Sequence, residues 1–370
     1  MLSWLYRSLV RPVLFSQDPE FVHNITVKGL QGVSSLGLLS KVMHGVCSSP
    51  ELPVSLLGLK FPNPIGLAAG MDKAGVAMRA WEAMGFGFSE LGAVTWYAQP
   101  GNPPPRVFRA VPAEAIVNRM GFNNDGAAAM ADRLKRYRDK GCWPSHPVGI
   151  NLGKSKITEL IDAPLDYLRS FTLLRELGDF FVINVSSPNT PNLRKLQDKE
   201  SLKAIFSRLQ AFNNKRGRSP KPILLKIAPD LSDEALEDIV DMIPKLEIAG
   251  IVATNTTITR PETENQKVKK VYAQQGGLSG KPLKVRSTEV IEFFYRKTRG
   301  MVPIIGVGGI FTAEDAWEKI THGASLLQIF TSLVYGGPLK VKEINMGLKR
   351  LMEENGFKML HEAVGSAIKK

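Results

Sequence analysis

Residues 304–332 read IIGVGGIFTAEDAWEKITHGASLLQIFTS and form the most informative segment of the 370-residue chain. The segment opens with a short apolar run, Ile304–Val307, and closes with another, Leu326–Phe330. Between them lies a helical pattern, Ala313–His322, preceded by Thr312 as an N-cap candidate. Two apolar runs joined by a helix are typical of parallel strands, because parallel neighbours need a long crossover connection. The segment therefore predicts a β-α-β unit.

The same alternation extends back to about Leu52 and gives eight short runs in all. They are uniformly apolar rather than alternating, as expected for parallel strands that are covered on both faces. A second helix, Ser232–Met242, is expected in the same way. Eight such units predict a single TIM (β/α)8 barrel over residues 52–370, with a doubly wound sheet as the main alternative. The predicted strands are Ile65–Ala69, Phe88–Val94, Val148–Leu152, Phe180–Val185, Ile223–Ile227, Gly250–Thr254, Ile304–Val307 and Leu326–Phe330.

Composition excludes several classes of protein. A hydrophobic content of 44% and a charged content of 22% exclude intrinsic disorder. Two cysteines, Cys47 and Cys142, are too few for a disulfide framework, a Cys-rich zinc site or an iron–sulfur cluster. The net charge of +13 indicates a polyanionic partner, which could be nucleic acid, an anionic membrane surface or a phosphorylated ligand.

Residues 1–45 differ from the rest of the chain. Arg7 and Arg11 interrupt the apolar residues of the first segment, so no run is long enough to span a membrane, and Pro12 is expected to kink or end the helix. Asp18 and Pro19 predict the start of a second helix, with a shorter third element after it. Two interpretations stay open: a helical flap packed on the barrel, or an interfacial hairpin with its basic residues toward lipid headgroups. The residues concerned are Trp4, Leu5, Leu9, Phe21, Val22 and Ile25 on the apolar faces and Arg7, Arg11, Lys28 and Lys41 on the basic side.

Polar residues follow most of the predicted strands, and in a barrel these positions converge on one mouth. The mouth is rich in Asn and Thr and poor in His, Asp and Glu, so it predicts a planar, amide-rich ligand and no metal. A single Asn is more simply a turn residue, but six at strand ends and adjoining loops favour a binding site. The glycines at 306–309, with those at 276–280 and Gly323, predict a phosphate site after the last two strands and hence a mononucleotide cofactor.

These motifs resemble a known family. GLAAGMDKAG, PRVFR, NRMGFNN, NVSSPNTP, LLKIAPDLS, ATNTT, GGLSGKPL and IIGVGGI stand in the order found in the class 2, quinone-dependent dihydroorotate dehydrogenases of pyrimidine biosynthesis. The resemblance covers nearly the whole chain. It implies a barrel with one FMN per chain, dihydroorotate and orotate as ligands, a membrane quinone as acceptor, and residues 1–45 as a membrane-docking and quinone-tunnel module. The implied location is peripheral, on the cytoplasmic face of the inner membrane, in contact with anionic lipid.

The resemblance also implies roles for individual residues. Ser187 matches the general base at C5 of dihydroorotate, where class 1 enzymes have cysteine, while the hydride passes from C6 to flavin N5. His23 and Arg109 match the quinone site. The substrate positions are Lys73, Asn118, Arg119, Met120, Gly121, Phe122, Asn184, Asn189, Asn255 and Thr256. The flavin positions are Ala68, Ala69, Gly70, Met71, Asp72, Thr95, Asn151, Asn184, Lys226, Thr254, Gly280, Gly309, Phe330 and Thr331.

One position departs from the family pattern. Phe330 stands where a tyrosine usually precedes the threonine, which puts the geometry of the quinone site in doubt. Two other functions stay open at this point. The barrel could reduce another pyrimidine or an enone, or the basic charge could mark a nucleic-acid binder. No basic patch with interleaved aromatic residues supports the second, and the cluster Lys267-Val268-Lys269-Lys270 is more simply a solvated face.

Overall fold

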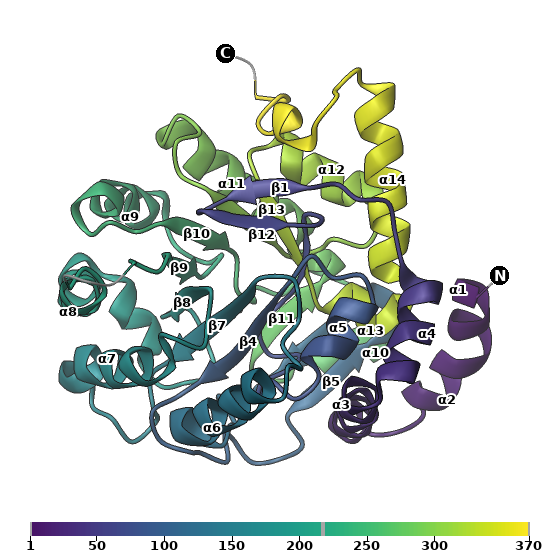
Figure 1. The fold of residues 1–370 in the computed structure, drawn as a ribbon, viewed down its shortest axis with the longest axis horizontal. Helices are drawn as coiled ribbons and strands as arrows, with labels where there is room; N and C mark the ends of the chain where they lie inside the picture. Colours follow the sequence, from purple (N-terminus) through teal and green to yellow (C-terminus); the bar gives the residue numbers. More distant parts are fainter. Residues whose placement is uncertain (1, 216–218, 369–370) are drawn as a thin grey trace.

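The computed structural model describes residues 2–215 and 219–368, and its centre is a closed eight-stranded parallel barrel (Figure 1). Every strand residue of the barrel except Val307 is buried, because side chains fill the inside and helices cover the outside. The prediction of a TIM barrel is confirmed, since the sheet closes instead of ending in two edges. Around the barrel the strands follow the order β10 (Gly250–Ala253), β12 (Ile304–Val307), β13 (Leu326–Ile329), β3 (Ile65–Leu67), β4 (Phe88–Val94), β7 (Val148–Gly153), β8 (Phe180–Asn184) and β9 (Ile223–Ile227).

Helices surround the barrel, as Figure 1 shows for α6 to α9, α11, α12 and α14. Two of them begin where the sequence predicts. The Ser232 hydroxyl accepts from the N–H of Ala235 at the start of α9, and Thr312 with Asp315 forms a capping box at the start of α12. The helices are α5 (Met78–Ala83), α6 (Gly126–Asp139), α7 (Ala163–Leu174), α8 (Lys199–Asn213), α9 (Asp233–Lys245), α10 (Gln266–Tyr272), α11 (Lys284–Lys297), α12 (Ala313–Thr321), α13 (Thr331–Gly336) and α14 (Lys340–Glu354).

Two small sheets were not predicted from the sequence. A hairpin of β1 (Val54–Leu56) and β2 (Leu59–Phe61) precedes the first barrel strand. An antiparallel sheet in the order β11 (Gly277–Gly280), β6 (Ala115–Asn118) and β5 (Val107–Ala110) is assembled from the long loops after β4 and β10. This second sheet matters for function, because it brings two distant loops together at the barrel mouth.

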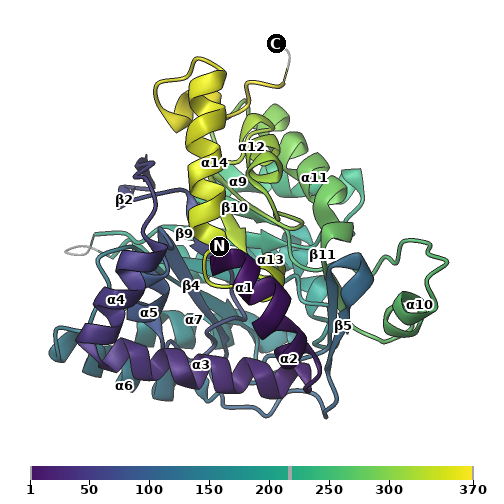
Figure 2. The same ribbon diagram turned by 90° about the vertical axis from the view of Figure 1, so that its right-hand side faces the viewer.

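The N-terminal helices form a layer against one side of the barrel (Figure 2). They are α1 (Leu2–Leu5), a π-helical turn (Tyr6–Val10), α2 (Arg11–Phe15), α3 (Pro19–Ser35) and α4 (Gly37–Cys47). Pro12 lies in the first turn of α2 and does not end the helix, since the wide π turn before it absorbs the irregularity. The predicted start of the second helix is confirmed, because the Asp18 carboxylate accepts from the N–H of Phe21.

This layer is held to the barrel by polar contacts. The Tyr6 hydroxyl donates to the carbonyl of Val334 at 2.9 Å, and Arg7 pairs with Glu343 at 2.9 Å. Arg11 donates to the carbonyl of Tyr335 at 3.2 Å. Arg7 and Arg11 thus have partners on the barrel, as the flap interpretation expects, although Arg7 stays exposed; whether either side chain also faces lipid headgroups stays a prediction. Lys28 and Lys41 are exposed.

The outer face of the layer is apolar. Eleven of the 21 exposed large hydrophobic side chains in the described part of the chain lie within its first 46 residues. Lone exposed apolar side chains need no explanation, but a concentration of this kind marks an interaction surface. Within residues 2–215 and 219–368, none of the helices combines the length and the hydropathy that crossing a membrane requires. The eleven residues are Trp4, Leu9, Val10, Val13, Phe21, Ile25, Leu36, Leu38, Leu39, Val42 and Val46.

Candidate active site

A cavity of about 520 Å³ lies between the barrel mouth, the β11–β6–β5 sheet and the N-terminal helices. Its volume is in the range of pockets that bury a cofactor or a substrate. All but four of the site residues expected from the resemblance line it, including Ser187, Lys226, His23 and Arg109. The structure thus brings together residues that are separated by as much as three hundred positions in the chain.

The four that do not line the cavity lie behind it or point away. The Asp72 carboxylate is fully buried and accepts from the N–H groups of Val76 and Ala77 and from Trp81 Nε1, so it holds the loop after β3. Thr95 is buried and its hydroxyl donates to the carbonyl of Tyr97 at 2.6 Å. Arg119 points outward and stacks on Phe108, 4.7 Å from the ring centroid. Asn151 is fully buried behind Asn184.

Asn184 and Asn255 belong to a continuous chain of hydrogen bonds. Asn184 Nδ2 donates to Asn151 Oδ1 at 3.0 Å, and Asn184 Oδ1 accepts from the Ser186 N–H at 3.3 Å. Asn255 Nδ2 donates to the Ser186 hydroxyl at 2.9 Å, and Asn255 Oδ1 accepts from the Thr256 N–H at 2.8 Å. Fixed amides of this kind present defined donors and acceptors to a bound ring.

Glu90 and Gln328 were missed by sequence reasoning. Both lie inside barrel strands, and Glu90 is fully buried. The Glu90 carboxylate accepts from Asn151 Nδ2 at 2.6 Å and from Gln328 Nε2 at 2.5 Å, and it lies 3.6 Å from Lys226 Nζ. The signal was available, because a charged and an amide side chain interrupt strands that are otherwise apolar.

Ser187 follows β8 in a loop that is fixed by Arg194. Arg194 donates from Nε to the carbonyl of Ser186 at 3.0 Å, from Nη1 to Asp230 Oδ2 at 2.8 Å and from Nη2 to the carbonyl of Thr256 at 3.0 Å. The Ser187 hydroxyl oxygen accepts from the N–H of Asn189 at 3.3 Å. The Thr190 hydroxyl is buried without a hydrogen-bond partner in the structure. Arg194 therefore sets the position of the loop that carries Ser187 relative to the Asn255 loop.

Lys73 is a partly buried cation in the cavity wall. It donates to Asn123 Oδ1 at 2.7 Å. Burial lowers the pKa of Lys73 to about 8, with Arg106 acting in the same direction and Glu20 opposing it. Burial also lowers the pKa of His23 to about 4, helped by the charge of Lys73, so His23 is neutral at physiological pH.

Glu20 connects the N-terminal layer to this wall. Arg106 forms a bidentate pair with Glu20, from Nε to Oε2 at 2.9 Å and from Nη2 to Oε1 at 2.7 Å. The same guanidinium donates to the carbonyl of Asn102, whose side chain donates to the carbonyl of Asn189 at 3.1 Å. Helix α3 is thus tied through two residues to the loop that carries an expected substrate contact.

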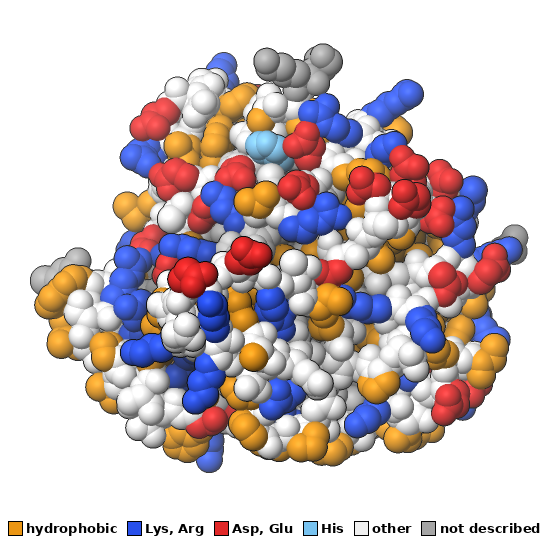
Figure 3. Space-filling model, turned by 180° about the vertical axis from the view of Figure 1, so that it is seen from behind, with side chains coloured by type: hydrophobic (Ala, Val, Ile, Leu, Met, Phe, Trp, Pro, Cys, Tyr) orange, Lys and Arg blue, Asp and Glu red, His pale blue; other side chains and the backbone are white. Residues whose placement is uncertain are grey.

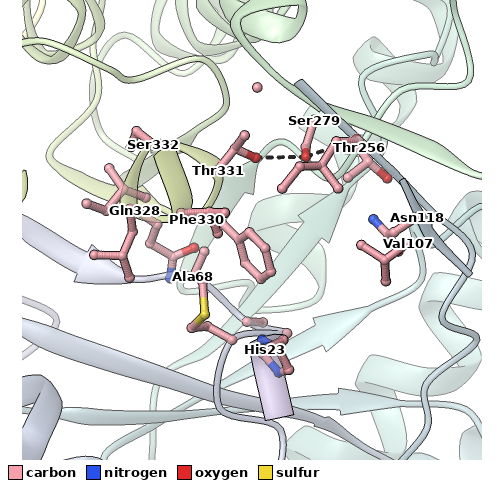
Figure 4. Close-up of a pocket in the computed structure, with 18 of the residues that line it drawn as sticks. His23, Ala68, Val107, Asn118, Thr256, Ser279, Gln328, Phe330, Thr331 and Ser332 are labelled. Carbon is pink, nitrogen blue, oxygen red and sulfur yellow. Dashed lines mark hydrogen bonds between the residues drawn. The ribbon is translucent and has the colours of Figure 1, made fainter. Parts of the chain in front are cut away.

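Figure 4 shows the end of the cavity where β13 and α13 meet. The ring of Phe330 projects into the cavity, and the hydroxyls of Ser279 and Thr331 are 2.8 Å apart. Two buried oxygens of lining residues, Gln328 Oε1 and Ser332 Oγ, have no hydrogen-bond partner. Buried polar atoms rarely stay unpaired in the functional state, so these two indicate a polar ligand.

Gly309 has a positive φ of 71°, and a Cβ there would lie 2.4 Å from Lys284 Cα. Close packing on α11 therefore requires this glycine independently of any phosphate. In residues 2–215 and 219–368, no group of three or more His, Cys, Asp or Glu side chains is placed to hold a metal ion.

Comparison with known proteins agrees with the sequence resemblance. The family described as Dihydroorotate dehydrogenase matches residues 51–352. The chain is 50% identical over 380 aligned residues to a dihydroorotate dehydrogenase (quinone) of Trichormus variabilis, and the alignment covers 99% of each chain. It is 51% identical over 366 residues to the dihydroorotate dehydrogenase (quinone) of Gloeobacter violaceus, with 98% of this chain and 99% of the relative covered. The structure is similar to that of ligand-free Eimeria tenella DHODH, with a TM-score of 0.84 and 34% identity over 95% of this chain and 100% of the other. This chain therefore belongs to the dihydroorotate dehydrogenase family.

Proposed function

We propose that this protein oxidises (S)-dihydroorotate to orotate in de novo pyrimidine biosynthesis, with FMN as its cofactor and a membrane quinone as electron acceptor. The observation that carries the proposal is a single cavity lined by Ser187, Lys226 and the Asn184–Asn255 array at one end and by α3 at the other. An aqueous substrate and a lipid-soluble acceptor need separate approaches to one cofactor. The cavity wall is mainly polar near Ser187 and mainly apolar near α3, so the first end suits the aqueous substrate and the second suits the lipid-soluble acceptor.

FMN fits the donors and acceptors that the cavity offers. Residues Ala68–Met71, Lys226, Thr254 and Gly280 would hold it, with Gly309 and Thr331 at the phosphate end. The unpaired Gln328 Oε1 is suited to an imide N–H, and the unpaired Ser332 hydroxyl is suited to a phosphate or ribityl oxygen. When bound, FMN supplies the electron-accepting N5 that takes a hydride from C6 of the substrate. A cation at Lys226 favours the negative charge that gathers on a reduced isoalloxazine.

Ser187 is the proposed general base. It would remove the proton from C5 while the hydride leaves C6, so that the C5–C6 double bond of orotate forms. No carboxylate or imidazole bonds the Ser187 hydroxyl among its described contacts, so loss of the hydride must assist loss of the proton. The unpaired Thr190 hydroxyl, three residues farther along the same loop, is suited to pass that proton on, with Phe122 shaping the path.

The remaining polar side chains would hold the substrate. Lys73 would pair with the carboxylate of orotate, and Asn118, Asn184, Asn189, Asn255 and Thr256 would bond its ring amides. Asn184 is buried and the other five side chains are partly buried, and a ligand that displaces water from them would strengthen each polar contact.

The N-terminal layer is the proposed membrane and quinone module. Its inner face contributes Val22, His23, Val27 and Leu30 to the cavity, whereas its outer face carries the eleven exposed apolar residues. An amphipathic layer of this kind lies in the interface of a bilayer rather than across it. Basic side chains are spread over the face seen in Figure 3 rather than gathered in one stripe. On the N-terminal layer itself Lys28 and Lys41 are exposed, and each basic side chain held near an anionic leaflet adds about 1 kcal/mol. We place the protein peripherally at the cytoplasmic face of the inner membrane.

The test begins with the absorption spectrum of the purified protein. We expect a yellow protein that bleaches when dihydroorotate is added and recovers its colour when a quinone is added. Denaturation should release one FMN per chain. Release of FAD, a colourless folded protein, or flavin that dihydroorotate does not reduce would each contradict the proposal. Reduction by another pyrimidine or an enone in place of dihydroorotate would identify a different flavin oxidoreductase.

A further inference from the structure

Glu90 is a buried carboxylate for which the proposed mechanism has no use. It lies in the middle of β4, fully buried, and its described partners are all donors: Asn151 Nδ2, Gln328 Nε2 and Lys226 Nζ. A charge buried in a barrel is destabilising unless its surroundings compensate for it, and an apolar residue would pack there at lower cost. The carboxylate is therefore expected to have a role beyond filling space.

The chemistry of a carboxylate fixes the orientation of the amides that touch it. Glu90 can only accept, so Asn151 must turn its NH2 group toward Glu90 and its Oδ1 away. That Oδ1 receives Asn184 Nδ2, which leaves Asn184 Oδ1 for the Ser186 N–H. The orientation of the Asn151 and Asn184 amides is thus fixed at one end by Glu90 and at the other by the Ser186 N–H. Both contacts require the same orientation.

Gln328 has no such second constraint. Its NH2 group faces Glu90 at 2.5 Å, and its Oε1 is buried in the cavity wall without a partner. The hydrogen bond to Glu90 is therefore the contact that orients the Gln328 amide with its oxygen, an acceptor, toward the cavity. A glutamine at position 90 would no longer fix this orientation. Its oxygen could accept from Asn151 only if its NH2 group pointed toward Gln328. The amide of Gln328 would then have to rotate and turn its oxygen toward position 90.

We propose that Glu90 is a positioning residue that orients Gln328 and Asn151, so that the cavity presents a fixed pattern of acceptors and donors to FMN and orotate. The inference rests on the proposed function, because those ligands supply the matching pattern. In this role Glu90 touches neither ligand. It also keeps a negative partner beside Lys226, which tunes the field that the bound ring experiences.

The decisive experiment is a swap of the carboxylate. In the variant Glu90→Gln, Gln328 is expected to present its NH2 group in place of its oxygen, and the apoprotein should bind FMN about 10-fold more weakly, which is the usual worth of one buried hydrogen bond. In the double variant Glu90→Gln with Gln328→Glu, the carboxylate at 328 again presents an acceptor and receives the NH2 group of position 90. Asn151 then keeps its orientation, and most of the FMN affinity should return.

Three measurements define the outcome: the FMN Kd of the apoprotein from flavin fluorescence, the orotate Kd from the flavin difference spectrum, and the midpoint of thermal unfolding. Ser89→Ala is the matched control. Ser89 is the adjacent buried polar residue of β4, but its hydroxyl lies 3.1 Å from His146 Nε2, away from the cavity. It should leave both Kd values unchanged.

Normal FMN and orotate binding by Glu90→Gln would overturn the inference. So would a double variant that binds FMN no better than Glu90→Gln, or an equal loss of affinity in Ser89→Ala. Failure of both Glu90 variants to fold would overturn it as well, since the carboxylate would then be needed by the barrel. A wild-type protein that binds no FMN would instead refute the proposed function.

Discussion

The guanidinium carbon of Arg109 lies 4.5 Å from the centroid of the Phe15 ring, and Arg109 Nη1 donates to the carbonyl of the same residue at 3.1 Å. A second bond reaches the carbonyl of Gln17 at 3.1 Å. Arg109 comes from β5 and Phe15 ends α2, so the pair fastens the N-terminal layer to the second sheet. Arg109 also lines the cavity. The residue expected at the quinone site therefore also holds the N-terminal layer in place.

Arg109→Ala should therefore raise the quinone KM by about 10-fold while dihydroorotate still reduces the flavin at the normal rate. The variant loses a cation–π contact and two hydrogen bonds to carbonyls, together worth about 1–3 kcal/mol, so the N-terminal layer should also become more sensitive to limited proteolysis. Arg138→Ala is the control, since Arg138 stacks on Trp143 at 3.8 Å, outside the cavity lining. A normal quinone KM in Arg109→Ala would contradict the assignment.

Ser187→Ala should leave FMN bound but slow flavin reduction by dihydroorotate by about 10²–10⁴, the usual contribution of a positioned general base. Reoxidation by quinone should be nearly unchanged, because that half-reaction does not use the base. Stopped-flow measurement of each half-reaction separates the two. An equal loss in both would mean that the substitution disturbed the loop held by Arg194 instead of removing a base.

The sequence predicted the barrel well because uniformly apolar runs report burial on both faces, a local property. It could not predict the β11–β6–β5 sheet, since its central strand, Ala115–Asn118, pairs with Gly277–Gly280 across some 160 residues of chain. The site shows the same division. Cavity residues at strand ends, such as Asn184, were predictable from their position. The polar character of Glu90 and Gln328 is visible in the sequence, but the partners that they meet inside the barrel are not. Asp72 lay in a predicted motif, yet its carboxylate serves the fold.

Orotate binding should weaken as the pH rises through about 8. Burial holds the pKa of Lys73 near 8, so in the free protein its ammonium is lost above that pH, and with it the charge that pairs with the ligand carboxylate. Below pH 8 the orotate Kd should be nearly constant, and above it the Kd should rise by up to about tenfold per pH unit. Lys73→Met should bind orotate weakly and remove this dependence. A wild-type Kd that stays flat from pH 6 to 9 would show that Lys73 keeps its proton or does not contact the ligand.

Deletion of residues 1–45 should separate the two half-reactions. The deletion removes His23 and the inner face of α3 from the cavity and removes all but one of the eleven exposed apolar side chains. The product should leave the membrane fraction, should still be reduced by dihydroorotate, and should be reoxidised poorly by long-chain quinones. The deletion also removes Glu20, the partner of Arg106, and Ser34, whose hydroxyl accepts from the N–H of Ala80 at 3.0 Å, so it carries a cost in stability.

Point variants on the outer face avoid that cost. Leu38 and Val42 are 75% and 58% exposed on α4 and do not line the cavity, so Leu38→Asp with Val42→Asp should leave the fold and the dihydroorotate half-reaction intact. Binding to vesicles that contain anionic lipid should fall, because two charges now oppose insertion of the apolar face. Turnover with a long-chain quinone in vesicles should fall in parallel, whereas turnover with a short, water-soluble quinone should not. If both the double variant and the deletion keep full activity with the long-chain quinone, the N-terminal helices are only a structural cover over the barrel.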